Sequence, residues 1–185
     1  MKVTVEKMAL DTLEVHKKLV WEEIKKYLTS PEFPIAFKVP SRYKFLEKFH
    51  WEIAMDYPER RGKYLRPTLL MLTAKAMGGK KKDILKTAAA MQISEDWILV
   101  HDDIEDDSLM RRGKPTLHKI YGIEQGINAG DSLHAIMWKI LFDNLKLLGS
   151  EKTAAIFNEF YSIMMRTTLG QTVDIKWFRE NNYLY

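Results

Sequence analysis

Residues 83–113, DILKTAAAMQISEDWILVHDDIEDDSLMRRG, decide how this chain is organised. The first part of the segment has the apolar content and the helix-forming residues of a long α-helix. Its three alanines, at positions 88–90, would let a neighbouring helix approach closely. The helical pattern then runs into a cluster of acidic residues that is followed by two arginines and a glycine. The segment therefore predicts one long helix that carries carboxylates at its C-terminal end.

The acidic cluster has the spacing of a metal site. Each helical residue turns by about 100°, so Asp102 and Asp106 should lie about 40° apart on one face, with Asp103 beside them. Three carboxylates in one patch repel one another unless a cation lies between them, and oxygen ligands favour a hard ion such as Mg²⁺. The guanidinium groups of Arg111 and Arg112 suit phosphate oxygens. The pattern indicates a metal-bridged phosphate site, although a solvated acidic helix end followed by a basic turn has the same spacing.

Composition limits the class of protein. The 185 residues, 46% of them hydrophobic, are enough for a single domain over residues 1–185 with a sizeable core. No stretch approaches the roughly 18 apolar residues that span a bilayer, so we expect a soluble, unexported protein. The absence of cysteine excludes disulfides and thiol chemistry and fits the cytoplasm. The net charge of +4 is modest and locally clustered, which an anionic small substrate explains as well as nucleic acid does.

The rest of the chain also has helical periodicity, and no run of residues resembles a strand. Ser41 and Ser150 are candidate N-caps, and Pro58 is expected to limit the helix that follows Ser41. Five further helices are predicted, at residues 3–28, 42–56, 64–77, 118–149 and about 151 to beyond 174. The prediction is an all-α helical bundle with a central groove, in which facing helices present ligands to one another.

A second basic group precedes and enters the helix predicted at residues 64–77. It consists of Arg60, Arg61, Lys63 and Arg66. Free backbone amides and the positive end of the helix dipole already favour an anion at such a helix start. The group therefore indicates a second phosphate site, with a solvated basic loop as the alternative.

Five segments, in order, resemble those of one enzyme family, the trans-isoprenyl diphosphate synthases, which include the farnesyl and geranylgeranyl diphosphate synthases. Residues 62–67, GKYLRP, resemble the family's GKxLRP segment, and residues 102–106, DDIED, resemble its first aspartate-rich motif. The RRG at 111–113 stands at the family's spacing after that motif. INAGD at 127–131 and GQTVD at 170–174 are similar to two further family segments. Each segment alone is weak, and the resemblance is carried by all five between residues 60 and 175.

The resemblance implies an isoprenoid synthase-like bundle and a magnesium-dependent prenyltransferase. Such an enzyme condenses isopentenyl diphosphate with an allylic diphosphate to give a C15–C20 isoprenyl diphosphate, without a nucleophilic side chain. In the family's metal site the first and last aspartates bind directly, which corresponds here to Asp102 and Asp106, with Asp103 in support. The resemblance also implies a cytoplasmic homodimer whose partners are the two diphosphates, with no nucleic acid.

The substrate contacts are likewise implied by the resemblance. Lys63, Arg66 and Arg112 would hold isopentenyl diphosphate, and Arg111 would contact the allylic diphosphate. Where the family usually has a histidine or glutamine that helps bind isopentenyl diphosphate, this chain has Glu95. An anion there should weaken diphosphate binding unless it is protonated, salt-bridged to Lys63 or Arg66, or turned away.

The second departure from the family is length. The chain ends at residue 185, before the place of the family's second aspartate-rich motif. We therefore interpret it as an N-terminal portion: a fragment, one piece of a split enzyme, or a shortened version of a longer chain. Because catalysis requires tighter binding of the transition state than of the ground state, half of a diphosphate clamp should be nearly inactive alone.

Three other functions are compatible with parts of the sequence. A non-catalytic subunit could pair with a full-length synthase, although the DDIED motif is not degraded. A class I terpene cyclase is disfavoured by the second arginine, Arg112, because cyclisation needs no isopentenyl clamp. His101 beside Asp102 resembles the pair of metal-dependent phosphohydrolases, but those enzymes need further histidines around the metal.

The family resemblance also points to Trp97, five residues before the aspartate-rich motif, as the floor of the pocket for the growing chain. A tryptophan there predicts a short product. Ideal helix geometry places Trp97 about 140° from Asp102, so Ile98 or Ser94 could share this role.

Overall fold

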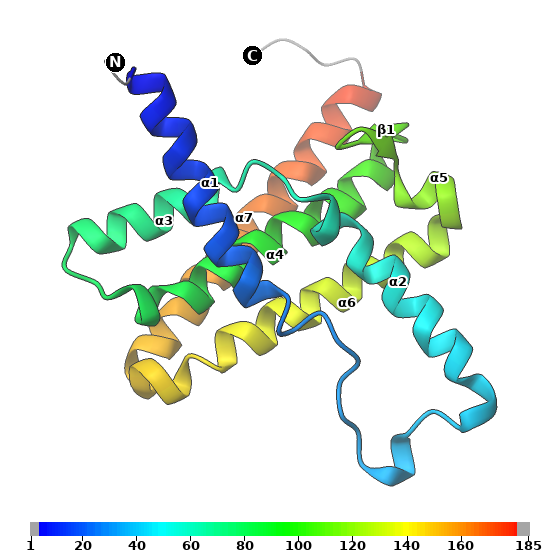
Figure 1. Ribbon diagram of the computed structural model, residues 1–185. Coiled ribbons are helices and arrows are strands. Elements are labelled where there is room, and N and C mark those ends of the chain that lie inside the picture. Colours follow the sequence, from blue (N-terminus) through cyan, green and yellow to red (C-terminus); the bar gives the residue numbers. More distant parts are fainter. Residues whose placement is uncertain (1–3, 181–185) are drawn as a thin grey trace. The chain divides into compact units, whose positions relative to one another are not determined.

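The computed structural model describes residues 4–180, and these are mostly helical (Figure 1). The predicted all-α class is confirmed. The chain divides into two compact units between Asp143 and Asn144, and each is described by itself. Among residues 4–180, no helix has both the length and the apolar character needed to cross a bilayer.

The first unit holds six of the helices. Two short 3₁₀ turns lie between the first and second helices, and a small hairpin lies between the fourth and fifth. The helices are α1 Val5–Ile24, α2 Lys44–Arg60, α3 Leu65–Ala76, α4 Lys81–Glu105, α5 Leu117–Tyr121 and α6 Ile123–Phe142; the 3₁₀ turns are Ile35–Phe37 and Ser41–Tyr43; the strands are β1 Met110–Arg111 and β2 Lys114–Pro115.

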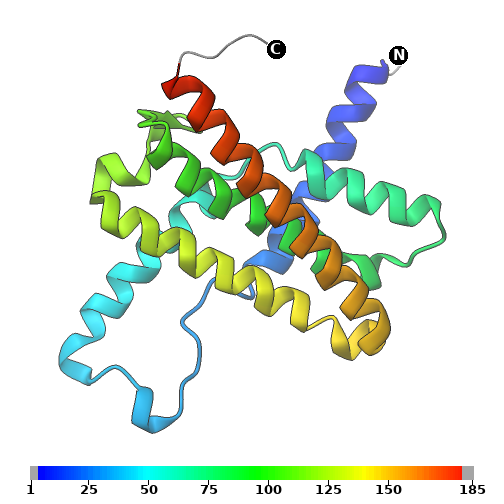
Figure 2. The same ribbon diagram turned by 180° about the vertical axis from the view of Figure 1, so that it is seen from behind.

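Helix α4 is the central helix of this unit. It packs against α1, α3 and α6, and it also contacts α2 and α5. Figures 1 and 2 both show α4 running through the middle of the unit with α6 alongside. Ala88, Ala89 and Ala90 are fully buried, as expected for residues whose small side chains permit close helix packing. Burying a large apolar side chain, such as Leu133 of α6, contributes roughly 1.5–3 kcal/mol to the core.

The ends of α2 differ from the sequence prediction. Ser41 does not cap it, because residues 41–43 form a 3₁₀ turn and α2 begins at Lys44 without a side-chain cap. Pro58 does not end it either. The helix continues to Arg60 with Pro58 inside its last turn. Proline removes one backbone donor, the N–H that would otherwise bond to the Ala54 carbonyl.

The hairpin was not predicted. Met110 and Arg111 pair antiparallel with Pro115 and Lys114. The two turn residues, Arg112 and Gly113, have φ of 51° and 79°. Positive φ at both central residues defines the type I′ turn that suits two-residue hairpins, and glycine adopts it without strain. The turn fixes where the side chains of the two consecutive arginines begin.

The second unit contains α7, Leu145–Arg179. Gly149 interrupts it with a non-helical φ of 77°, so the regular helix follows that residue. This agrees with the predicted last helix, which was expected to start near residue 151. Gln171 and Asp174 of the GQTVD segment lie on this helix.

Candidate diphosphate site

The aspartates at the end of α4 are directed to two different environments. Asp102 is half-buried and Asp106, the C-cap residue, is exposed and donates its backbone N–H to the Asp102 carbonyl at 2.9 Å. Asp103 is fully buried and accepts a hydrogen bond from the Tyr57 hydroxyl at 2.5 Å. The expectation that three carboxylates share one surface patch is therefore wrong for Asp103. The physical reason is the 100° helical step, which turns Asp103 toward α2.

Arg111 bridges these two environments. Its Nε–H lies 3.1 and 3.0 Å from the two Asp103 oxygens, and its Nη2 lies 2.5 Å from Asp103 Oδ1. The same Nη2 lies 3.6 Å from Asp102 Oδ2. Hydrogen bonding to Asp103 raises the pKa of the Arg111 guanidinium above its ordinary value, since the bonds favour the charged form. Asp103 thus holds Arg111 beside Asp102, which agrees with a supporting role for Asp103.

Tyr57 completes this arrangement from α2. Its side chain is fully buried, and burial first, then the bond to Asp103, raises the pKa of the phenol above its ordinary value. The hydroxyl therefore stays a donor to the carboxylate at neutral pH. A charge-assisted bond of this kind is stronger than a neutral one and fixes the carboxylate that orients Arg111.

The carboxylates of Asp102 and Asp106 fit one mode of magnesium binding, in which the protein supplies only part of the coordination shell. Among residues 4–180, no three His, Cys, Asp or Glu side chains converge as a protein-only metal cage. Two carboxylates one turn apart instead suit Mg²⁺, which keeps several waters and is commonly held by one or two carboxylates together with substrate phosphates. Asp102 and Asp106 would therefore hold the ion jointly with a bound diphosphate, next to Arg111.

Arg112 points into a separate, more buried place. Its side chain is 12% exposed, and its Nη2 lies 2.7 Å from Asp96 Oδ1. Its Nη1 donates to the Tyr57 carbonyl at 2.7 Å. The guanidinium also lies against Gly62, where an added Cβ would come within 2.9 Å of Nη2. The structure therefore brings Arg112 to the segment that carries Lys63.

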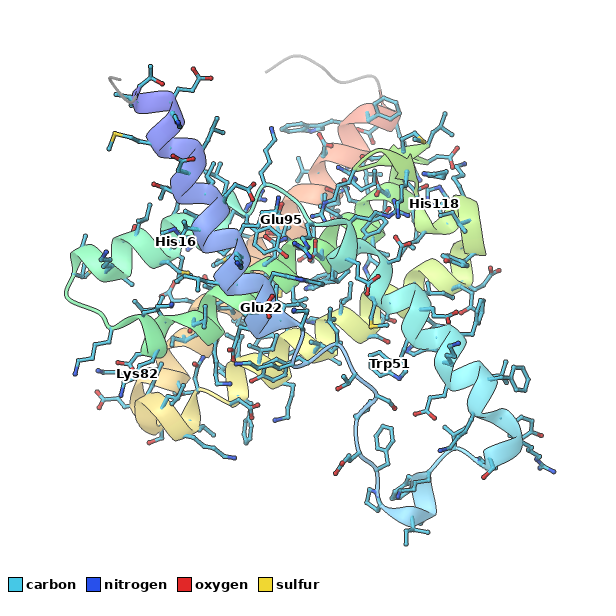
Figure 3. The ribbon with its side chains drawn as sticks, viewed as in Figure 1. His16, Glu22, Trp51, Lys82, Glu95 and His118 are labelled. Atoms are coloured by element: carbon cyan, nitrogen blue, oxygen red, sulfur yellow. The ribbon has the colours of Figure 1, made fainter. Side chains whose placement is uncertain are left out.

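Glu95 forms an ion pair with Arg66 at 3.0 Å. Of the alternatives considered for Glu95, the salt bridge to Arg66 is the one the structure contains. The Arg66 side chain is 66% exposed, so its charge is shared with solvent, and Lys63 is also exposed. Figure 3 shows Glu95 on the central part of α4. Arg66 and Arg112 thus pair with adjacent carboxylates of α4, and Lys63 follows Gly62, against which Arg112 lies; we call these three residues the second basic cluster.

Sequence reasoning missed Asp96. It is fully buried, and burial raises its pKa to about 6 although Arg112 acts in the opposite direction. Its Oδ2 has no hydrogen-bond partner among the described residues, and neither has the buried Tyr64 hydroxyl. The available signal was an aspartate directly before the apolar residues 97–100, because an unpaired charge is costly in a core.

Trp97 is buried on the side of α4 that faces α6. Its ring centroid lies 4.7 Å from that of His134 and 5.5 Å from that of His101. His101 Nε2 lies 3.4 Å from the Ile127 carbonyl and 3.6 Å from an Asp131 carboxylate oxygen. His101 is therefore directed toward the INAGD segment of α6.

Comparison with known proteins identifies the family of this chain. A family model described as polyprenyl synthetase matches residues 48–184. The chain belongs to the polyprenyl synthetase family. This confirms the resemblance drawn from the five segments. The chain is 36% identical over 147 residues to a geranylgeranyl diphosphate synthase of Saccharolobus solfataricus, covering 78% of the chain and 42% of that relative.

Two further members support the same family and its fold. A geranylfarnesyl diphosphate synthase of Aeropyrum pernix is 34% identical over 117 residues, covering 62% of the chain and 37% of that relative. The crystal structure of a geranylgeranyl pyrophosphate synthetase from Pyrococcus horikoshii superposes with a TM-score of 0.75 at 26% identity, covering 91% of the chain and 48% of that structure. The chain thus spans about two fifths to one half of the length of these relatives.

Proposed function

We propose that this chain forms the prenyl-transferring site of a magnesium-dependent isoprenyl diphosphate synthase, acting on isopentenyl diphosphate and an allylic diphosphate. The observation that carries the proposal is the separation of two consecutive arginines by the hairpin. Arg111 lies beside Asp102, and Arg112 lies against the Gly62 backbone near Lys63. Two diphosphates therefore have two cationic positions. The names of the relatives support the same reaction class.

In the proposed reaction the allylic C–O bond breaks, and the diphosphate leaves with the electron pair. Magnesium held by Asp102 and Asp106 would supply positive charge to the leaving oxygens. Arg111, fixed by Asp103, donates hydrogen bonds to the same oxygens as their negative charge develops, and such pre-positioned donors lower the barrier. The chain needs no nucleophilic side chain for this step.

The second basic cluster orients the other substrate. Lys63, Arg66 and Arg112 would hold the diphosphate of isopentenyl diphosphate so that its double bond faces the allylic carbon. A new C–C bond forms there, and a proton is lost to the released diphosphate. Holding both reactants in this geometry converts a bimolecular step into an effectively unimolecular one.

We also propose a short product, C15 or C20, because Trp97 would close the pocket for the growing chain. The names of the relatives, geranylgeranyl and geranylfarnesyl diphosphate synthase, support short-chain products, although the second lies one isoprene unit beyond this range. A cytoplasmic homodimer is proposed as its working form, by resemblance to the family.

Calorimetry with Mg²⁺ and a non-hydrolysable allylic diphosphate analogue tests the proposal. We expect coupled binding of metal and analogue, abolished by Asp102→Ala. Asp107→Ala is the matched control, because Asp107 stands in the same acidic segment but is 78% exposed and ion-paired to Lys119 at 2.5 Å. That variant should bind as the wild type does. Equal binding by Asp102→Ala would remove the basis of the assignment.

A further inference from the structure

Two adjacent carboxylates of α4 pair with two cations of the second basic cluster, but in different surroundings. Glu95 pairs with Arg66, whose side chain is 66% exposed. Asp96 pairs with Arg112, and that ion pair is almost entirely shielded, with side-chain exposures of 1% and 12%. The first pair is a solvent-screened contact of small net energy, whereas the second is a buried pair in which each charge depends on the other.

Arg112 is held from three sides. Asp96 accepts from Nη2, the Tyr57 carbonyl accepts from Nη1, and Gly62 leaves the space that the guanidinium fills. The backbone of Arg112 is in the left-handed region, with φ of 51°, so the turn also restricts where the side chain starts. A guanidinium has five N–H donors in a rigid fork. Two terminal nitrogens are anchored to the protein, and further donors of the same fork are left for a ligand.

We propose that Asp96 is a positioning residue that acts through Arg112. Its buried carboxylate fixes the Arg112 guanidinium so that the remaining N–H donors meet the second diphosphate together with Lys63 and Arg66. The inference rests on the proposed function and adds to it a residue that does not touch the substrate.

The direction of the change in anion affinity distinguishes a positioning role from a purely electrostatic effect. Removing a negative charge near an anion site should tighten anion binding by Coulomb's law, whichever carboxylate is removed. Loss of a positioning residue should instead weaken anion binding. Without Asp96, the Arg112 guanidinium would become mobile and would have to be ordered again when the ligand binds. Glu95→Gln and Asp96→Asn remove the same charge one residue apart, so they form a matched pair.

The experiment measures binding of isopentenyl diphosphate by calorimetry in EDTA, so that the metal-dependent position is not filled. We expect Asp96→Asn to weaken binding about 10-fold, and Glu95→Gln to tighten it, because that change removes an anion beside Arg66. In the Arg112→Gln background, Asp96→Asn should have no further effect, because Asp96 acts through that arginine. The Arg112 Nη–H signals in ¹H–¹⁵N spectra report the atoms bound by Asp96 and by the Tyr57 carbonyl, and they should exchange slowly with solvent in the wild type and in Glu95→Gln, and rapidly in Asp96→Asn.

The binding measurements can contradict the proposal in two ways. Tighter binding by Asp96→Asn, or an undiminished effect in the Arg112→Gln background, would overturn it and leave the proposed function standing. No binding by the wild type would overturn both.

Should Asp96→Asn fail to fold, the wild type alone decides. Lowering the pH through about 6 protonates Asp96, which is surrounded by Arg112, Gln92, Glu95 and Tyr64. The Arg112 Nη–H protons should then be less protected from exchange, measured relative to free arginine at the same pH because this exchange is base-catalysed, and an unchanged protection at pH 5 would overturn the inference.

Discussion

Replacing Tyr57 by phenylalanine removes one oxygen atom from the centre of the candidate site. The lost hydroxyl donates to Asp103 Oδ2 at 2.5 Å, and the ring itself is fully buried, so the shape of the core is kept. Asp103 in turn orients Arg111. The variant should therefore affect both the stability of the first unit and the order of Arg111.

The magnitude follows from the partners that remain. A hydrogen bond to a charged group contributes about 1.5–3 kcal/mol. Asp103 Oδ2 keeps the Arg111 Nε–H at 3.0 Å, so the carboxylate is not left without a donor and the cost should be at the lower end. We expect a loss of about 1.5–2 kcal/mol in the free energy of unfolding. For a chain of this size that corresponds to a fall in Tm of roughly 3–8 °C.

Tyr64→Phe is the matched control. The Tyr64 ring is equally buried, but its hydroxyl has no hydrogen-bond partner among the described residues. Removing a buried, unbonded hydroxyl should be neutral or stabilise the chain by about 1 kcal/mol. Urea unfolding followed by circular dichroism measures both variants, with unchanged m-values as the check that the unfolding reaction is the same. The reasoning is refuted if Tyr64→Phe costs as much as Tyr57→Phe, or if Tyr57→Phe costs nothing.

Two further predictions concern α4. The Asp96 carboxyl should titrate near pH 6 in ¹³C spectra, and higher still in Arg112→Gln, because Arg112 lowers this pKa. Because the pKa of Asp96 is raised in the folded state, the native state binds more protons than the unfolded state between about pH 4 and 6. The contribution of Asp96 to stability therefore grows as the pH falls through that range. A titration midpoint near pH 4 would contradict this prediction. Trp97→Ala should cost about 3–5 kcal/mol and, in the active enzyme at a temperature where it stays folded, should lengthen the prenols seen by chromatography after dephosphorylation. An unchanged product distribution from a folded, active variant would show that Trp97 serves only the core.

Most of the helices could be predicted because their periodicity is long and regular. The single helix predicted at residues 118–149 is wrong, because Gly122, with φ of 92°, separates α5 from α6, and α6 ends at Phe142. Helix α4 was expected from Asp83 into the aspartates and extends from Lys81 to Glu105. The hairpin could not be found in the same way. Its strands have two residues each, too few for alternation to appear, and its turn places Arg112 at a position where Asn or Asp is the usual signal.

The residue types of the candidate site stay a prediction from the sequence, whereas the pairings of these side chains could not be read from it. Helical spacing placed Asp102 and Asp106 together, but the same spacing left open whether Asp103 shares their surface or turns inward. That choice depends on Tyr57 and Arg111, which come from elsewhere in the chain. Asp96 escaped notice for the same reason, since its partner Arg112 is 16 residues away on the hairpin.

Tyr57 is connected to both arginines through different atoms. Its hydroxyl donates to Asp103, the carboxylate that orients Arg111, and its backbone carbonyl accepts a hydrogen bond from Arg112. A movement of the last turn of α2 therefore shifts both guanidinium groups at once. If the first diphosphate to bind restrains this turn, the second meets an arginine that has already lost part of its freedom. The two ligands should then bind cooperatively, and linkage requires that each raises the affinity for the other by the same factor.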